Sequence, residues 1–518
     1  MRNHMAAGWF YSPKQIASYF GTRITSLKPP KIRPENPVRV LRQLNRYQWS
    51  MFLLGFTAWM WDAVDFYTVS ICLTEIAQDF GLENSQVSWA LTVSLMLRAV
   101  GALLFGAFAD RYGCKWPMMV ALSLFVVLEL ATGFCRNLPQ LLAVRSLYGI
   151  AMGGMYGPAA STALSDVPYD ARGVLSGLYQ IGFAVGSLLA SVLYRALVPT
   201  TSHGWRSLFW FSAAPPLFIM VFRWYMPETS HFQALRAKRA EQKRAAGEEA
   251  DTAKRAASAG WGAGLAAFGR ESGRAIRENW VLFVYMVVLM AAFNSCSHGS
   301  QDLYPTFLKS QVGLDATHVV IVTVAGQLGS IVGSSVMGYL STFSGRRLIM
   351  LVSCVVGGAL VPAFVIPRRM GILVATSLLE QAFVSGVWGP VPIHLMELSP
   401  PALRTTVVGL TYQLGNLASS ASATIQAVLG ERFPLPAAPA GDDKAGGGAR
   451  HDYGKVMVVF MACVWALLFV LLLAGPEMSQ DERDEEAETA RKLEEDRGGR
   501  LCRRRGCLSP EDAGVSEK

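Results

Sequence analysis

The chain has little charge for its length. Only 16% of its 518 residues are Asp, Glu, Lys or Arg, whereas 52% are hydrophobic and the mean hydropathy is positive. A soluble protein of this size carries about 25% charged residues and divides into two or more compact domains. The shortage of charge argues against a soluble protein and favours one that lies in a membrane.

Signs of enzyme chemistry and of metal binding are also missing. The eight cysteines show no metal-ligand spacing, and their scatter supports no disulfide framework. No nucleophile–base pair or phosphate-binding loop stands out. We therefore expect a protein that is not an enzyme and that holds no metal and no cofactor.

Residues 1–27 also lack the continuous apolar core of a secretory signal peptide.

Long apolar runs dominate what is present. A helix needs about 20 apolar residues to cross the hydrocarbon core of a bilayer. Candidate runs of this kind number twelve, six before and six after a charged central connection. The predicted membrane spans are residues 49–73, 86–109, 117–135, 139–163, 173–197, 206–226, 281–303, 318–340, 348–366, 371–395, 405–428 and 456–474.

Basic residues gather on one side of these spans. They crowd residues 1–47, the connection 227–279, and the short connections 110–115 and 345–347. If twelve spans alternate in direction, all four segments lie on one side, which the positive-inside rule places in the cytoplasm together with both termini. We interpret the net charge of +9 as a basic face against the lipid bilayer of the plasma membrane, and we expect no nucleic-acid partner.

The two halves of the chain repeat at an offset of 232 residues. Three clusters of glycine, proline and basic residues coincide under this shift. The coinciding pairs include Gly106 with Gly338, Gly157 with Gly389, and Gly177 with Gly409. Repeated six-span halves place a substrate site near the membrane midplane, between the halves, and transport then follows from rocking one half against the other.

The same pattern divides the chain into five parts. They are a cytoplasmic N-terminal segment (1–47), a six-helix bundle (48–226), a cytoplasmic linker (227–279), a second six-helix bundle (280–475) and a cytoplasmic tail (476–518). The composition of the linker predicts a partly helical or flexible segment, and the alternating charges of the tail are typical of disorder. Regulatory kinases and the ubiquitin machinery are the expected partners of these tails.

The seventh span carries an unusual density of polar residues. Asn294, His298 and Asp302 are spaced by four residues and share one face of a helix, with Gln301 beside them. Hydrocarbon makes such groups costly, so they usually face an aqueous cavity or one another. This stripe predicts a path for protons and for a solute that forms hydrogen bonds.

Residues 106–115 read Gly-Ala-Phe-Ala-Asp-Arg-Tyr-Gly-Cys-Lys and resemble the signature loop of the major facilitator superfamily, from which Cys114 departs. The resemblance implies an all-α integral membrane protein with the major facilitator fold, in which 12 transmembrane helices form two pseudo-symmetric six-helix bundles. Physically, such a charged loop can cap a helix end and lock one conformation. The predicted gating residues are Asp110, Arg111, Gly113 and Lys115, with Glu397 and Arg404 at a later span end.

A second resemblance concerns the substrate. Six residues of the seventh span match in type the motif of the fungal lactate and carboxylate:proton symporters, the Jen family. They are Asn294, Ser297, His298, Gln301, Asp302 and Thr306. The likeness covers most of residues 26–475. It implies transport of a short monocarboxylate such as lactate, pyruvate, acetate or propionate together with a proton, although some members carry dicarboxylates such as malate or succinate.

Arg98 lies in the middle of the second span, where the resembling family has an essential arginine. Its planar fork suits a carboxylate, so we predict that it anchors the substrate. The alternative is a structural pair with Asp62, Asp65 or Glu129, and the two aspartates are predicted to support the helices in this way.

The remaining predicted roles fall to the seventh span. His298 and Asp302 lie one turn apart and are predicted to couple proton movement, without a choice between them. Asn294, Ser297 and Gln301 are suited to binding substrate, or else they join helices. Thr306 follows Pro305 and is predicted to satisfy backbone groups that the proline leaves without partners.

The combined prediction is a proton-coupled symporter that imports short-chain monocarboxylates by alternating access. Its small partners are the carboxylate and the proton. A dicarboxylate symporter is the first alternative. A carboxylate sensor built on a transporter fold is the second.

Overall fold

The computed structural model of the chain describes residues 19–27, 36–82, 84–245, 273–274, 276–431, 433 and 452–477. These residues are almost entirely helical, and none of them forms a strand. Most of the predicted linker and tail lies outside this described part of the chain.

Six long helical segments build the N-terminal half. The unbroken ones are α3 (Arg46–Ile71), α5 (Asn84–Tyr112), α6 (Lys115–Gly133) and α9 (Tyr169–Leu197), and the interrupted ones are α7 (Leu138–Gly153) with α8 (Tyr156–Leu164) and α10 (Trp205–Ser212) with α11 (Ala214–Tyr225). The short helices are η1 (Thr25–Leu27), α2 (Pro37–Gln43), α4 (Leu73–Phe80) and, after α11, α12 (Ser230–Ala245). Asn45 begins α3 with a capping box, in which its side chain and that of Gln48 each accept the other's backbone N–H.

The C-terminal half repeats this plan. Its unbroken helices are α15 (Trp280–Gln301), α17 (Ala316–Ser344), α18 (Arg346–Val365) and α23 (Tyr453–Ala474), and its interrupted ones are α19 (Met370–Trp388) with α20 (Val391–Leu398) and α21 (Arg404–Ser419) with α22 (Ser422–Glu431). Three short helices, α16 (Tyr304–Phe307), η2 (Leu308–Val312) and η3 (Pro401–Leu403), lie in the connections.

These twelve segments coincide with the twelve predicted spans to within a few residues. Nine segments in the described part of the chain are long and apolar enough to cross a membrane. The other three are α3, α7 with α8, and α21 with α22. In α3 the buried residues include Asp62 and Asp65, so its lower hydropathy reflects polar groups inside the protein and not a shorter helix.

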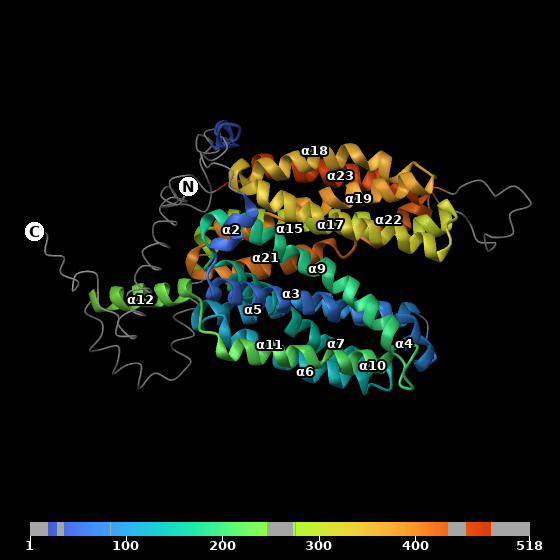
Figure 1. Cartoon of the computed structure of the whole chain (residues 1–518), viewed down its shortest axis with the longest axis horizontal. Coiled ribbons are helices and arrows are strands. Elements are labelled where there is room, and N and C mark those ends of the chain that lie inside the picture. Colours follow the sequence, from blue (N-terminus) through green and yellow to red (C-terminus); the bar gives the residue numbers. More distant parts are fainter. Residues whose placement is uncertain are drawn as a thin grey trace, which may run out of the picture.

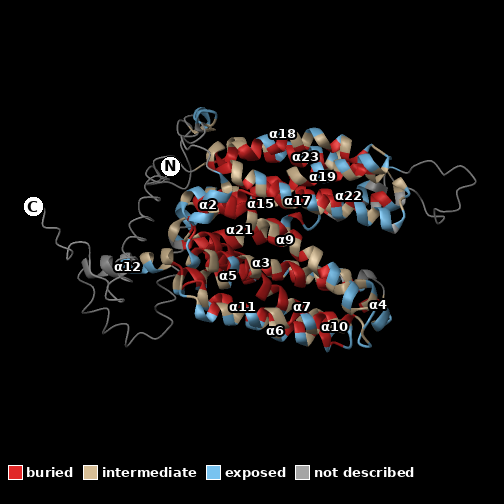
Figure 2. Cartoon of the chain, viewed as in Figure 1, coloured by how far each residue is buried: buried red, intermediate tan, exposed pale blue. Residues whose placement is uncertain are grey.

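Figure 1 shows the two halves side by side along their helix axes, with α9 and α21 at the boundary. They touch where α9 packs on α17 and where α5 and α8 pack on α21. We call the end that carries α12 the α12 end, and the opposite end, which carries α4, the α4 end (Figure 1). Buried residues follow the inner faces of both halves (Figure 2), while exposed apolar residues such as Val127, Val355 and Val470 lie where lipid would cover them.

Glycines of the internal repeat lie where the halves cross. A Cβ at Gly157 would lie 2.6 Å from the carbonyl oxygen of Thr405, and a Cβ at Gly177 would lie 2.4 Å from that of Ser334. A residue with a side chain cannot occupy either position without moving a helix. Small residues let membrane helices approach closely, so the duplicated glycines set the distance between the halves.

An ion pair is buried inside the N-terminal half. The guanidinium of Arg145 on α7 donates two hydrogen bonds, of 3.2 and 3.0 Å, to the two carboxylate oxygens of Glu129 on α6. The rings of Tyr148 and Phe209 lie within 5 Å of the same guanidinium. Both side chains are almost fully buried, so each charge depends on the other for its compensation.

Breaking this pair from one side is expected to destabilise the protein. Glu129→Leu leaves a buried guanidinium without its carboxylate and should lower the free energy of unfolding by about 3–5 kcal/mol. Thermal unfolding of the purified protein in detergent measures the loss. The double variant Glu129→Leu/Arg145→Met should recover most of it. Arg274→Ala, which breaks the exposed pair with Glu278, serves as the control and should change little.

Candidate functional site

Arg98 is buried on α5 and is loosely paired. Its Nη2 lies 4.0 Å from Oδ2 of Asp62 on α3, and it donates to Sδ of Met152 at 3.0 Å. The ring of Phe66 lies 5.0 Å from its guanidinium carbon, and its Nε has no hydrogen-bond partner in the described part of the chain. A separation of 4.0 Å exceeds hydrogen-bond distance, so Arg98 retains donors for another carboxylate.

Close helix packing holds Arg98 in place. A Cβ at Gly149 would lie 2.3 Å from the carbonyl oxygen of Ser94, and one at Gly153 would lie 1.9 Å from that of Arg98. The backbones of α5 and α7 are therefore in direct contact at this level. The position of the Arg98 backbone is consequently fixed, while its guanidinium reaches across to α3.

Asp62 is the aspartate that lies near Arg98, and Asp65 has a different partner. The hydroxyl of Tyr148 donates to Oδ2 of Asp65 at 2.6 Å. Glu129, the third acid considered from the sequence, binds Arg145. These charged groups thus form two sets of contacts, one of Arg98 with Asp62 and one in which Tyr148 links Asp65 to the pair of Arg145 and Glu129.

Three polar residues of α15 bind neighbouring helices or their own. Asn294 donates to the carbonyl oxygen of Met290 at 2.9 Å. Ser297 Oγ accepts from Trp388 Nε1 at 2.8 Å, and Gln301 Nε2 donates to Gln381 Oε1 at 3.0 Å. The last two bonds join α15 to α19. Thr306 lies in α16, and its side chain is outside the described part of the structure.

His298 and Asp302 form the contact that the sequence predicts. His298 Nδ1 lies 3.0 Å from Asp302 Oδ2, and His298 Nε2 lies 3.3 Å from Oδ1 of Asn416 on α21. The amide oxygen of Asn416 can only accept, so in this geometry Nε2 carries a proton. A histidine held between a carboxylate and an amide oxygen can accept and release a proton at its Nδ1 side.

A layer of aromatic side chains separates the two ends of the molecule. Tyr156 of α8 stacks on Tyr412 of α21, with ring centroids 3.9 Å apart. Further rings extend this contact from both halves, namely Trp59, Tyr179, Phe183, Phe293 and Trp388. Tyr156 and Tyr412 are buried, so the aromatic layer fills the space between the halves where α8 meets α21.

The two ends of the molecule differ in accessibility. The side chains of His298 and Asp302, near the α4 end of α15, are 27% and 37% exposed. At the α12 end, Asp110, Arg346 and Glu397 are all buried. The contacts at the α12 end are therefore closed, whereas His298 and Asp302 keep exposed side-chain surface near the α4 end of α15.

Asp110 closes the α12 end by capping a helix of the other half. Its two carboxylate oxygens accept the backbone N–H groups of Thr405 and Thr406 at 2.9 and 2.8 Å. These residues begin α21, where the helix dipole places partial positive charge. Cys114 Sγ lies 3.9 Å from Thr405 Oγ1 on the same contact. The guanidinium of Arg111 lies 5.2 Å from the ring of Tyr112.

Lys115 acts within its own half and has a counterpart in the repeat. Its Nζ donates to the carbonyl oxygens of Trp224 and Met226 at the end of α11. Arg347 likewise donates to two carbonyl oxygens at the end of α23. The glycines that precede these cations, Gly113 and Gly345, have φ of 96° and 88°, a conformation that favours glycine.

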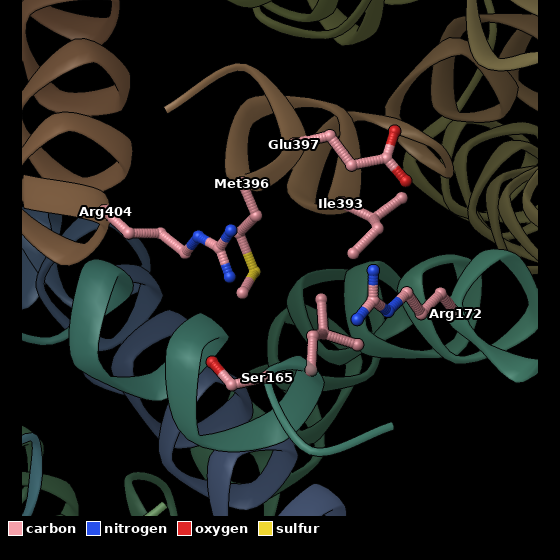
Figure 3. A pocket seen from close by; sticks show the side chains of 7 residues that line it. Ser165, Arg172, Ile393, Met396, Glu397 and Arg404 are labelled. Atoms are coloured by element: carbon pink, nitrogen blue, oxygen red, sulfur yellow. The ribbon is translucent and has the colours of Figure 1, made fainter. Parts of the chain in front are cut away.

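Glu397 and Arg404 lie where the halves meet at the α12 end. Glu397 accepts from Arg346 at 3.3 Å, and Arg404 lies 3.4 Å from Nε2 of His231 on α12. Figure 3 shows that both line one small pocket together with Arg172 of the N-terminal half. Glu397 and Arg346 of α18 both belong to the C-terminal half, whereas the approach of Arg404 to His231 and the pocket lining shared with Arg172 join the two halves. Separating the halves would disrupt these last two contacts.

Residues 39–485 match the family described as "Sugar (and other) transporter". The chain belongs to this transporter family. It is 37% identical to the "Carboxylic acid transporter protein homolog" of Saccharomyces cerevisiae over 90% of the chain and 74% of that relative. It is 32% identical to the "Gallate transporter" of Pseudomonas putida, over 42% of the chain and 48% of that relative.

The fold is also that of solved transporters. The proton:xylose symporter XylE of the major facilitator superfamily superposes with a TM-score of 0.60, covering 82% of this chain and 94% of XylE, at 15% identity. Together with the family match and the 37% identical relative, this likeness confirms the predicted superfamily and its all-α membrane fold, and the family confirms the prediction that the protein is not an enzyme. No cluster of possible metal ligands occurs among the described residues.

Several partners of the predicted residues were not identified from the sequence. Asn416, Gln381, Trp388 and Tyr148 contact His298, Gln301, Ser297 and Asp65, respectively. One signal was available, because Asn416 is an amide within a predicted membrane span, as Asn294 is. The indole of Trp388 and the hydroxyl of Tyr148 give no such signal, since both rings are ordinary in membrane helices.

Removing the charge of Asp110 is expected to open the α12 end. Asp110→Asn keeps the shape but loses the interaction with the start of α21, worth about 2 kcal/mol, or roughly a thirtyfold change in the ratio of closed to open forms. The buried thiol of Cys114 reports the change, because it becomes accessible when the halves separate. The rate at which a membrane-permeant maleimide modifies Cys114, followed by mass spectrometry, should rise.

Lys115→Ala is the matched control, because the bonds of Lys115 lie within one half. Its Cys114 should remain as protected as in the unaltered protein. Equal protection of Cys114 in Asp110→Asn and in the unaltered protein would contradict a locking role for Asp110.

Proposed function

We propose that the protein imports short monocarboxylates together with protons by alternating access, at the plasma membrane and with both termini in the cytoplasm. The observation that carries the proposal is Arg98, a buried guanidinium whose nearest carboxylate lies 4.0 Å away. A substrate carboxylate that accepts two hydrogen bonds from the guanidinium of Arg98 would satisfy this group better than Asp62 does. The two relatives described above, named for carboxylic acids and for gallate, support this substrate class.

The charges around Arg98 suggest how a proton is coupled to the anion. Three buried carboxyl groups, those of Asp62, Asp65 and Glu129, share the N-terminal half with the guanidinium groups of Arg98 and Arg145. A substrate carboxylate that binds Arg98 displaces Asp62 and leaves it without a cation. Uptake of one proton by Asp62, or by the His298–Asp302 pair, returns the net charge to its value before the anion bound, and this is favoured because unpaired charge is costly in a buried site.

The conformation fits the loading step of this cycle. The aromatic layer and the Asp110 contact close the α12 end, where the basic connections place the cytoplasm. Substrate and proton would enter from the α4 end, past His298 and Asp302. Release inside requires the halves to separate at α21 and α9, which breaks the contact of Asp110 with the start of α21 and the approach of Arg404 to His231. In this proposal Asn294, Ser297 and Gln301 bind the part of the substrate next to its carboxylate.

A dicarboxylate substrate is the alternative, and it requires one more cation or proton per molecule. Among the described residues close to Arg98, no second cation contacts Asp62 or Phe66, which favours a single carboxylate. A sensor that signals through its tails without net flux is the other alternative. Accumulation of substrate against a gradient would exclude it.

The first test of the proposal is uptake of labelled lactate in yeast that lacks its own carboxylate carriers. Arg98→Ala should reduce uptake by more than about a hundredfold, because it removes a buried charge-assisted contact worth about 3–5 kcal/mol. Arg98→Lys should recover little, since an ammonium cannot form the fork. Arg206→Ala, which breaks the partly exposed pair with Asp79 far from Arg98, is the control. Normal lactate uptake by Arg98→Ala at equal surface expression would refute substrate anchoring.

A second test separates the two possible proton carriers. Asp62→Asn cannot take up a proton, so its lactate uptake should lose the stimulation that an acidic outside pH gives to the unaltered protein. If Asp302→Asn loses that stimulation and Asp62→Asn keeps it, the proton travels on α15 instead. One anion moving with one proton carries no charge, so an inward current evoked by lactate would contradict the stoichiometry.

A further inference from the structure

The last carbonyl groups of α23 are capped one after another by side chains from other parts of the chain. The bonds are Tyr285 Oη to Leu471 O (3.2 Å), Arg347 Nε and Nη2 to Leu472 O and Leu473 O (2.8 and 2.7 Å), Tyr19 Oη to Ala474 O (2.9 Å) and Arg23 Nη1 to Gly475 O (2.9 Å). A helix end leaves its final carbonyls without helical partners. Here, residues that precede the first membrane helix complete the cap on the last one.

Residues 19–27 thus precede the N-terminal half in the sequence but bind the C-terminal half. The guanidinium of Arg23 lies 3.7 Å from the centroid of the Tyr19 ring, so the two capping side chains support each other. Leu27 packs against the hydrophobic core that includes Leu468 and Leu472 of α23. The segment (dark blue in Figure 1, near the end of α18) is therefore fixed at the end of the C-terminal half.

The outward side of this segment is apolar. Phe20 and Ile24 are 56% and 77% exposed and lie one helical turn apart, each directly after a residue that caps α23. The apolar span of α23 ends at Ala474, the residue whose carbonyl Tyr19 binds. Tyr19 consequently holds Phe20 and Ile24 at the depth where hydrocarbon meets the lipid headgroups.

The surrounding sequence has the charge that suits anionic headgroups. Residues 14–33 contain five basic residues, Lys14, Arg23, Lys28, Lys31 and Arg33, and no acidic residue. Basic segments with large apolar side chains lie in the membrane interface and bind anionic lipid. Residues 19–27 and their surroundings thus have both parts of such a site, an exposed apolar pair at a defined depth and a basic surrounding sequence.

We propose that residues 19–27 are a membrane-surface anchor, in which Phe20 and Ile24 insert into an anionic lipid leaflet while Tyr19 and Arg23 hold the segment on the end of α23. The inference depends on the membrane location of the family and not on the substrate. The anchor joins the N-terminal segment to the C-terminal half at the α12 end, which is the end that must open during transport.

Spin labels on single introduced cysteines test this anchor in the full-length protein. Cys463, which is exposed, and Cys502 and Cys507 of the tail are first replaced by alanine, leaving the buried cysteines in place. Labels at Phe20→Cys and Ile24→Cys are compared with one at Thr22→Cys, which lies on the other side of the turn. The protein is reconstituted in nanodiscs of zwitterionic lipid, with or without anionic phosphatidylserine.

Collision with oxygen, which concentrates in lipid, is compared with collision with a water-soluble nickel chelate. The depth parameter compares these two collision rates and is positive in lipid and negative in water. With anionic lipid we expect it to be positive at residues 20 and 24 and negative at residue 22. In zwitterionic lipid its values at residues 20 and 24 should shift toward those of water. Tyr19→Phe removes the hydrogen bond to the carbonyl oxygen of Ala474, so the spectral lines of the label at residue 20 should become sharper in this variant. Water-like accessibility at residues 20 and 24 in both lipids would overturn the proposal, whatever the result for lactate uptake.

Discussion

The ion balance inside the N-terminal half is the constraint on which much of this transporter depends. The charges buried there include the guanidinium groups of Arg98 and Arg145 and the carboxyl groups of Asp62, Asp65 and Glu129. A charge that lacks compensation costs several kcal/mol in such surroundings. Glu129 and Arg145 satisfy each other with two hydrogen bonds, so this pair is a fixed part of the bundle. The looser contact of Arg98 with Asp62 is the one that a substrate anion can replace at low cost.

The internal repeat has kept its packing and lost its charge symmetry. Gly177 and Gly409, which are equivalent under the repeat, bring helix backbones into contact at the two crossings between the halves. A Cβ at Gly177 would lie 2.4 Å from the carbonyl oxygen of Ser334, and one at Gly409 would lie 3.4 Å from Cα of Gly157. Asp110, however, has Thr342 as its equivalent, so only the contact of α5 with α21 holds a carboxylate at a helix start. The crossing of α5 with α21 is therefore held by a charge, and α9 is held on the C-terminal half by packing and by the hydroxyl of Ser176, which donates to the carbonyl oxygen of Gly389.

Much of the fold could be predicted from the sequence, because hydrocarbon imposes a length and a composition on each span. The twelve spans, the repeat and the superfamily follow from apolar runs, punctuating glycines and the loop at 106–115. The contact between His298 and Asp302 could also be predicted, since residues four apart on one helix are neighbours. The partners of Arg98 could not be ranked, because Asp62, Asp65 and Glu129 differ only in how distant helices turn toward one another.

The sequence by itself thus determined which segments are helical, which residues share a helix face, and where charge accumulates. Only the tertiary structure decided that Asp62 faces Arg98, that Asp65 binds Tyr148, and that Asn416 completes the contact of His298. It also decided which end is closed, through Asp110 on α21 and through Tyr156 on Tyr412. Helix periodicity is a local property of the chain, whereas pairing across helices depends on their rotation and depth, which packing of the whole molecule sets.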